Sequence, residues 1–168
     1  MRRLFSSATC CFLAAGSCAL AACSAQSAKP NDSAATAGSG NTVGCRATDA
    51  DVYAPGIAKP GAAGNFEFTL LSSTPAPPAL NDNRFVVQVS DADGNAVDGH
   101  LSVALDMPEH GHSSPTQPTI SFDGEQNAFV LEPMRLFMVG LWRFTFDFET
   151  SVGSASLADS AVFEFCVD

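Results

Sequence analysis

Residues 142–149 read WRFTFDFE, and this stretch decides the fold. Aromatic residues occupy every second position, Trp142, Phe144, Phe146 and Phe148, and polar or charged residues stand between them. Successive side chains of a β-strand point to opposite faces of its sheet. A period of two therefore predicts a strand with one face in an apolar core and the other in water.

The same alternation recurs on both sides of this stretch. Residues 66–70, 101–107 and 162–167 also alternate between large apolar residues and smaller or polar ones. Residues 85–89 (FVVQV) predict a further strand that is more completely buried. No segment shows a convincing helical period.

Turn signals separate these runs. Asp93-Gly94 and Asp123-Gly124 are hairpin dipeptides, and the proline-rich residues 75–78 predict an extended loop. Short strands with turns about every 8–12 residues predict an all-β, immunoglobulin-like antiparallel β-sandwich of about seven strands for residues 42–168. The 13 phenylalanines of the chain suit the core of such a sandwich.

The N-terminal residues predict export and lipid attachment. Two arginines precede a largely apolar stretch, which is the pattern of a secretory signal. Residues 20–23 (LAAC) fit the lipobox of bacterial lipoproteins, which implies diacylation of Cys23 and cleavage before it. We expect a lipoprotein signal peptide at residues 1–22, and a lipidated cysteine with a flexible tether at residues 23–41. Ordinary cleavage and an uncleaved anchor helix are the alternatives.

Lipid attachment implies where the domain is located and whether its remaining cysteines are oxidised. The domain would be anchored to a bacterial membrane in the cell envelope, outside the cytoplasm. Only Cys45 and Cys166 remain once the leader is removed and Cys23 is capped. In an oxidising compartment, two such thiols most simply form a disulfide. A metal-ligating thiolate pair is the alternative.

The chain is acidic, with a formal net charge of −10, and loss of the two leader arginines brings it near −12. Such a surface repels the phosphates of nucleic acids and attracts cations only diffusely. We therefore expect no nucleic-acid partner. The charge by itself does not identify a metal site.

Residues 107–115 (MPEHGHSSP) are the most unusual stretch. His110 and His112 are separated by one glycine, and imidazole is the commonest metal-ligating side chain near neutral pH. A flexible Gly111 would let both rings turn toward one ion. A nearby thioether sulfur is a soft ligand that selects Cu(I) over harder cations.

The order of the strands predicts which other residues reach this loop. The chain leaves the loop through residues 119–122, reverses at 123–124 and returns through 127–131. It therefore brings two more methionines to the loop's end of the sandwich, whereas His100 begins its strand at the opposite end. The predicted copper ligands are His110, His112, Met138, Met134 and Met107. The alternatives are that the methionines only plug the core and that the His-Gly-His loop is simply solvated.

Two motifs resemble a known family. Residues 107–112 (MPEHGH), then Pro118 and residues 137–144 (FMVGLWRF), resemble the YtkA-like family, which is related in pattern to FixH-type domains. The resemblance spans roughly residues 65–150 and implies a small exported or membrane-anchored β-sandwich protein, associated with copper handling or oxidase assembly. Val139 stands where the family usually has proline, and two serines follow His112 in place of a more glycine-rich continuation. Neither departure removes a candidate ligand.

Other constellations do not form sites. Residues 91–95 begin like a calcium loop, but Ala96 replaces the turn glycine and Ser102 replaces the bidentate glutamate. Asp147 and Glu149 share the outward face of one strand, which is a solvated face rather than an acid/base pair. The sequence contains no nucleophile elbow, phosphate-cradling loop or cysteine–histidine pair. We expect a protein that is not an enzyme.

Two functional hypotheses follow. In the first, the protein is a membrane-tethered lipoprotein that faces the periplasm or the cell surface. It binds a metal, expected to be copper, through the His/Met cluster and acts as a chaperone or buffer. In the second, the sandwich is a non-catalytic interaction module that docks on an envelope partner. The His-Gly-His loop would then be a connector or part of a recognition surface.

Overall fold

The structure is a computed structural model that describes Cys45 and residues 50–168. The predicted signal peptide (residues 1–22), Cys23 and the tether (residues 23–41) lie outside the described residues. Within the described part, no helix is long and apolar enough to cross a membrane.

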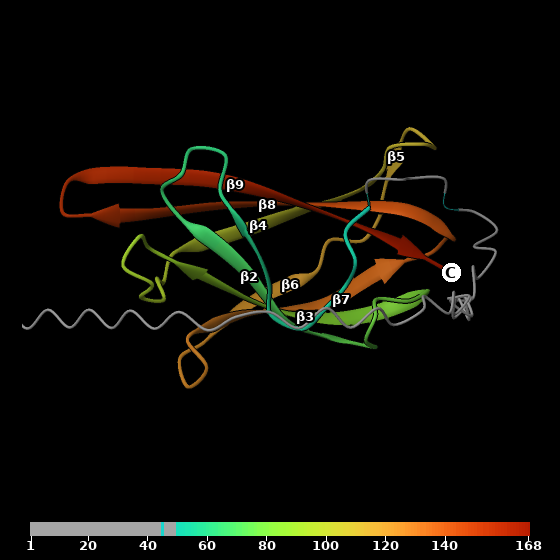
Figure 1. Cartoon of the computed structure of the whole chain (residues 1–168), viewed down its shortest axis with the longest axis horizontal. Coiled ribbons are helices and arrows are strands. Elements are labelled where there is room, and N and C mark those ends of the chain that lie inside the picture. Colours follow the sequence, from blue (N-terminus) through green and yellow to red (C-terminus); the bar gives the residue numbers. More distant parts are fainter. Residues whose placement is uncertain (1–44, 46–49) are drawn as a thin grey trace, which may run out of the picture. The chain divides into compact units, whose positions relative to one another are not determined.

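The alternating aromatic stretch forms part of the longest hairpin. β8 (Gly140–Val152) and β9 (Ala155–Val167) have 13 residues each and pair antiparallel along their whole length. Trp142 lies opposite Phe165 and Phe144 opposite Phe163, so the aromatic residues of both strands share one face. Figure 1 shows this hairpin extending past the other strands at one end.

A four-stranded sheet is built around this hairpin. β4 (His100–Met107) pairs with the other edge of β8, with Leu105 opposite Phe144. The short strand β5 (His112–Ser113) pairs with the end of β4. The order in this sheet is β5-β4-β8-β9.

The facing sheet has five antiparallel strands in the order β1-β2-β3-β7-β6. These strands are β1 (Ile57–Pro60), β2 (Glu67–Thr74), β3 (Asn81–Ser90), β6 (Thr119–Asp123) and β7 (Ala128–Leu136). The predicted strands are all present in the two sheets. The predicted proline-rich loop joins β2 to β3.

The two sheets have the immunoglobulin arrangement. The order β2-β3-β7-β6 facing β4-β8-β9 corresponds to the four-plus-three strand pattern of that fold. The predicted all-β, immunoglobulin-like sandwich is therefore confirmed. The described residues form nine strands rather than about seven because β1 and β5, with four and two residues, are too short to show an alternating pattern.

Aromatic side chains fill the space between the sheets. Phe66 of the β1–β2 turn packs edge-on against Phe148 of β8, with ring centroids 5.0 Å apart. Each fully buried phenylalanine contributes about 1.5–3 kcal/mol relative to an exposed one. The largest fully buried aromatic side chains are Trp142, Phe68, Phe85, Phe144, Phe146, Phe148, Phe163 and Phe165.

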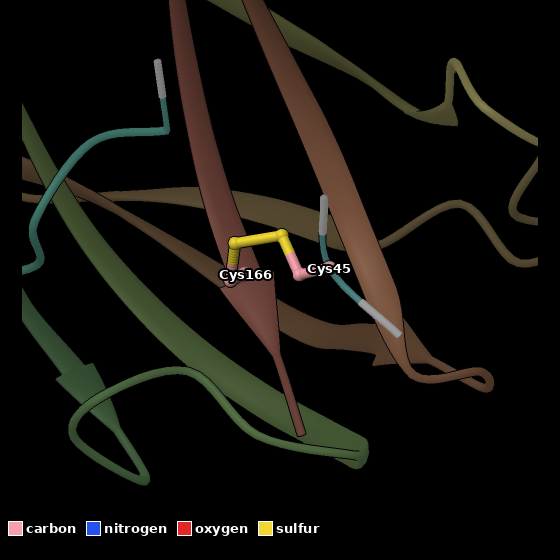
Figure 2. The surroundings of a disulfide bond; sticks show 2 residues. All are labelled: Cys45 and Cys166. Atoms are coloured by element: carbon pink, nitrogen blue, oxygen red, sulfur yellow. A yellow bond between two sulfur atoms is a disulfide. The ribbon is translucent and has the colours of Figure 1, made fainter. Parts of the chain in front are cut away.

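Cys45 and Asp51, two described residues before β1, contact the free edge of β9 near its C-terminal end. Cys45 forms a disulfide with Cys166 of β9, in agreement with the cysteine count, and their Cα atoms are 5.7 Å apart (Figure 2). The backbone N–H of Asp51 donates to the carbonyl of Glu164 (2.7 Å), and the Asp51 carboxylate accepts from Lys59 Nζ (2.6 Å). An exposed edge strand is a template for unwanted pairing, and these contacts occupy the edge at Glu164 and Cys166.

A buried carboxylate holds the turn between β1 and β2 against β9. Asp159 accepts hydrogen bonds from the backbone N–H groups of Ala63 (2.7 Å), Asn65 (2.8 Å) and Phe66 (3.1 Å). Gly61 lies so close to this carboxylate that a Cβ at position 61 would overlap it. Glycine is therefore required at position 61 for space.

Candidate metal centre

The chain folds back tightly after β4. The carbonyl of Met107 accepts hydrogen bonds from the backbone N–H groups of His110 (3.0 Å) and Gly111 (2.9 Å), and His112 then pairs with Met107. Gly111 has a φ of +67°, a conformation that glycine adopts without steric cost. We call residues 107–113 the apex loop. It places both histidines at one end of the four-stranded sheet.

The connection between β7 and β8 lies against the apex loop. The ring of His112 stacks on Phe137, with centroids 5.5 Å apart, and Phe137 packs edge-on against Trp142 at 5.3 Å. The indole N–H of Trp142 donates to the carbonyl of Met138 (2.9 Å). The two segments therefore meet at the same end of the sandwich, as the strand order predicts.

The two imidazoles lie at a separation that one metal ion can bridge. A metal about 2 Å from an imidazole nitrogen lies about 3.2 Å from that ring's centroid, so two rings on one ion have centroids at most about 6.4 Å apart. The centroids of His110 and His112 are 5.7 Å apart, with the ring planes inclined by 42°. Both side chains are exposed, so both rings are accessible to an incoming ion.

The three methionines of the predicted ligand set differ in accessibility. Met107 and Met134 are fully buried and belong to the hydrophobic core, so they pack the end of the sandwich. Met138 is 37% exposed and follows Phe137, which contacts His112. Of the three, Met138 is therefore the one whose thioether an ion can reach from solvent.

The acidic residues in and next to the apex loop do not add a third hard donor to the histidines. Asp106 accepts a hydrogen bond from the hydroxyl of Ser113. Among the described residues, no group of three or more His, Cys, Asp or Glu side chains is arranged to hold a metal ion. The candidate donors at this end of the sandwich are the two imidazoles of the apex loop and the thioether of Met138 in the connection between β7 and β8. This set falls short of the four ligands of a structural zinc site and suits a soft ion such as Cu(I).

His100 lies at the other end of β4, opposite Glu149 of β8, as the sequence predicts. Residues 91–95 form a hairpin turn in which the carboxylate of Asp91 accepts hydrogen bonds from the backbone N–H groups of Asn95 and Asp93. These hydrogen bonds hold the pKa of Asp91 below its ordinary value, and the one from the backbone N–H of Asn95 has the largest effect. The turn has the solvated hairpin structure expected for it.

Phe137 is the member of this cluster that the sequence did not single out. It stacks on one candidate ligand and precedes another. The sequence marks it only as the first residue of the family-like stretch 137–144, and its stacking could not be predicted because the stacking partner lies in a different loop.

Comparison with known proteins identifies one family. A family model described as YtkA-like matches residues 62–147, just over half of the chain. The matched range contains the apex loop and the connection between β7 and β8 that stacks on it. No curated protein and no solved structure matches the chain.

Proposed function

The chain belongs to the YtkA-like family, and on that premise we propose that it is an exported lipoprotein whose β-sandwich binds copper at the apex loop, as a chaperone or buffer. The observation that carries the proposal is the pair of exposed imidazoles of His110 and His112, 5.7 Å apart. Met138, which is partly exposed and follows the Phe137 that stacks on His112, would supply the thioether. The chain is a binding protein in this proposal, not an enzyme.

The donor set favours the reduced form of copper. Thioether sulfur is soft, and soft ligands select Cu(I) over magnesium, calcium or manganese, which prefer oxygen. The apex loop is open to solvent on the histidine side, so an ion can enter and leave. Such access suits a protein that transfers or buffers copper.

The test is a competition titration of the full chain, purified in a neutral detergent, with Cu(I) against a colorimetric chelator. We expect one Cu(I) per chain. The His110→Ala, His112→Ala double variant should bind at least about 100-fold more weakly, which corresponds to about 2.7 kcal/mol.

The third histidine supplies the matched control. His100 is also exposed but lies at the opposite end of β4, so His100→Ala should keep the wild-type affinity. Equal affinity of the double variant and the wild type would reject the apex site. An equal loss in the His100→Ala variant would show that copper binds histidines unspecifically.

The envelope location is the second part of the proposal. It rests on the lipobox at residues 20–23 and is supported by the Cys45–Cys166 disulfide, since disulfides persist in oxidising compartments. Metabolic labelling with a fatty-acid analogue should mark the wild-type protein and leave the Cys23→Ser variant unlabelled. Labelling of the variant would reject Cys23 as the lipid attachment site.

A second candidate function is an interaction module that docks on an envelope partner. Phe137, Met138 and Val139 are consecutive apolar residues that are each about 40% exposed, and exposed apolar groups are typical of docking surfaces. A pull-down with a strong chelator present distinguishes the two functions. Recovery of a specific partner without copper would favour the interaction module, and recovery that depends on added Cu(I) would favour copper transfer.

A further inference from the structure

Ser114 directly follows the apex loop and has no role in the copper proposal. Its side chain is only 5% exposed, whereas the neighbouring Ser113 is exposed. A buried hydroxyl has lost its hydrogen bonds to water, so it is stable only where the protein supplies partners. The partners of Ser114 therefore show what this residue holds together.

Ser114 is hydrogen-bonded to both sheets. Its Oγ donates to the carbonyl of Arg135 in β7 (3.1 Å), with the carbonyl of Thr116 as a more distant acceptor (3.3 Å), and it accepts from the backbone N–H of Thr116 (3.4 Å). The backbone N–H of Ser114 donates to the carbonyl of Leu105 in β4 (2.8 Å). Since β4 and β7 belong to different sheets, Ser114 cross-links the two layers of the sandwich.

This cross-link lies beside the two segments that carry the candidate ligands. Ser114 comes two residues after His112, and Arg135 comes two residues before Phe137, on which the ring of His112 stacks. Met138 is the next residue. The pairing of β6 with β7 has already ended at this point. The hydroxyl of Ser114 therefore joins the apex loop to the β7–β8 connection where strand pairing no longer does so.

The neighbouring serine makes no such connection. The hydroxyl of Ser113 donates to the carboxylate of Asp106, its register partner in β4. Both residues belong to the four-stranded sheet, so this hydrogen bond does not reach β7. Ser113 is thus a matched control for the loss of a hydroxyl beside the histidines.

The segment that carries Met138 is held separately. The indole N–H of Trp142, which is fully buried, donates to the carbonyl of Met138 (2.9 Å). This hydrogen bond fixes the backbone of Met138 relative to β8 but does not join it to the apex loop. The position of the histidines relative to the thioether therefore depends on contacts between the two segments, and the hydrogen bond from Ser114 to Arg135 is a buried one.

We infer that Ser114 is a positioning residue of the proposed copper site: its hydroxyl holds the histidine loop against the connection that carries Met138, so that copper meets donors already held together. The inference rests on the proposed function, and Ser114 itself does not touch the ion. Donors that are held in place before binding lose less conformational freedom when the ion binds, so the affinity is higher.

The positioning is tested first without metal. Ring stacking shifts the proton signals of an imidazole, so the ring signals of His112 report its contact with Phe137. In NMR spectra of the full chain in a neutral detergent, with ¹³C-labelled histidine rings assigned through His112→Ala, Ser114→Ala should move the His112 signals toward their positions in Phe137→Leu. Ser113→Ala should leave them at the wild-type positions. Unshifted His112 signals in Ser114→Ala would overturn the inference.

A double-mutant cycle then tests whether Ser114 acts through Met138. In the Cu(I) competition titration, Ser114→Ala should weaken binding about fivefold, the size expected for one neutral hydrogen bond. In the Met138→Leu background the same substitution should weaken binding less than about twofold, because the thioether is already absent. Ser113→Ala should keep the affinity of its parent in both backgrounds.

The inference and the proposed function fail in different ways. Equal losses from Ser114→Ala in both backgrounds, or no loss in either, would overturn the inference while copper binding by the wild type still stands. Absence of copper binding by the wild type would reject the proposed function, and the metal-free spectra would still decide whether Ser114 positions the loop. A single urea unfolding transition for Ser114→Ala verifies that the variant is folded.

Discussion

His112 and Phe137 lie nearly face to face at the end of the sandwich, with ring centroids 5.5 Å apart and planes inclined by 26°. Phe137 in turn packs edge-on against Trp142, the single tryptophan of the chain. A candidate metal ligand is thus connected to a fluorescent side chain through one intervening ring. This connection would make the proposed copper binding observable without a label.

We expect Cu(I) to change the fluorescence of Trp142 when it binds at the apex loop. The ion would reorient the ring of His112, and this movement would alter the packing of Phe137 against the indole. Fluorescence titration should saturate at one Cu(I) per wild-type chain. Phe137→Leu should reduce the signal while copper affinity changes less than about threefold. A full fluorescence response in the His110→Ala, His112→Ala variant would contradict the apex assignment.

The disulfide is expected to contribute a measurable part of the stability. Cys45 and Cys166 are 121 residues apart in sequence, and closing so long a loop restricts the unfolded chain strongly. The Cys45→Ser, Cys166→Ser variant should lose about 2–5 kcal/mol of unfolding free energy. Urea unfolding of the full chain measures the loss, and reduced wild type should behave as the variant does. A shared midpoint for oxidised wild type and variant would show that the disulfide contributes nothing.

Asp159 should make the stability depend on pH in the acid range. Burial of its carboxyl raises the pKa, but the hydrogen bonds from the N–H groups of Ala63, Ser160, Phe66 and Asn65 together lower it by more. The folded pKa therefore lies below the unfolded value of about 3.9. A group with a lowered folded pKa stabilises the fold above the unfolded pKa, and this stabilisation is lost as pH falls through the folded pKa.

The Asp159→Asn variant tests this dependence. It should lose about 1–3 kcal/mol at pH 7, because an amide cannot satisfy all the N–H donors. The difference from wild type should shrink as the pH falls below about 4. Urea unfolding between pH 7 and pH 3 measures it, with Asp147→Asn as the control because that carboxylate is exposed. A difference that stays constant with pH would show that the ionisation of Asp159 does not stabilise the turn.

The alternating pattern was sufficient to predict the core strands but not where each one ends. Residues 127–131 were expected to form a strand, yet β7 continues through Pro133 to Leu136. Proline lacks the N–H that a central strand needs. It is tolerated here because the pairing of β6 with β7 ends at Glu132 of β7. At Pro133 no β6 residue lies opposite β7, so no β6 carbonyl there needs an N–H partner. Single-sequence patterns do not show where a neighbouring strand stops.

Contacts between segments far apart in the chain could not be predicted either, because a single sequence does not show which segments lie side by side. Asp159 falls at an inward-facing position of β9, which marks it as unusual, but its hydrogen-bond donors lie more than 90 residues earlier. The stacking of His112 on Phe137 likewise joins two loops. Strand order could predict that the loops meet at one end. It could not predict which side chains touch.

The methionines provide the sharpest test of the proposed copper site, because they have the same side chain and differ in burial. Met138→Leu removes an accessible thioether and nearly preserves volume, so Cu(I) affinity should fall about tenfold, or about 1.4 kcal/mol. Met134 is fully buried in the core. Met134→Leu should therefore leave copper affinity unchanged and cost less than about 1.5 kcal/mol of stability. Competition titration and urea unfolding of both variants measure the two effects. If Met134→Leu weakened copper binding and Met138→Leu did not, the thioether ligand would come from inside the sandwich, and the end of the core would have to open for the ion to enter.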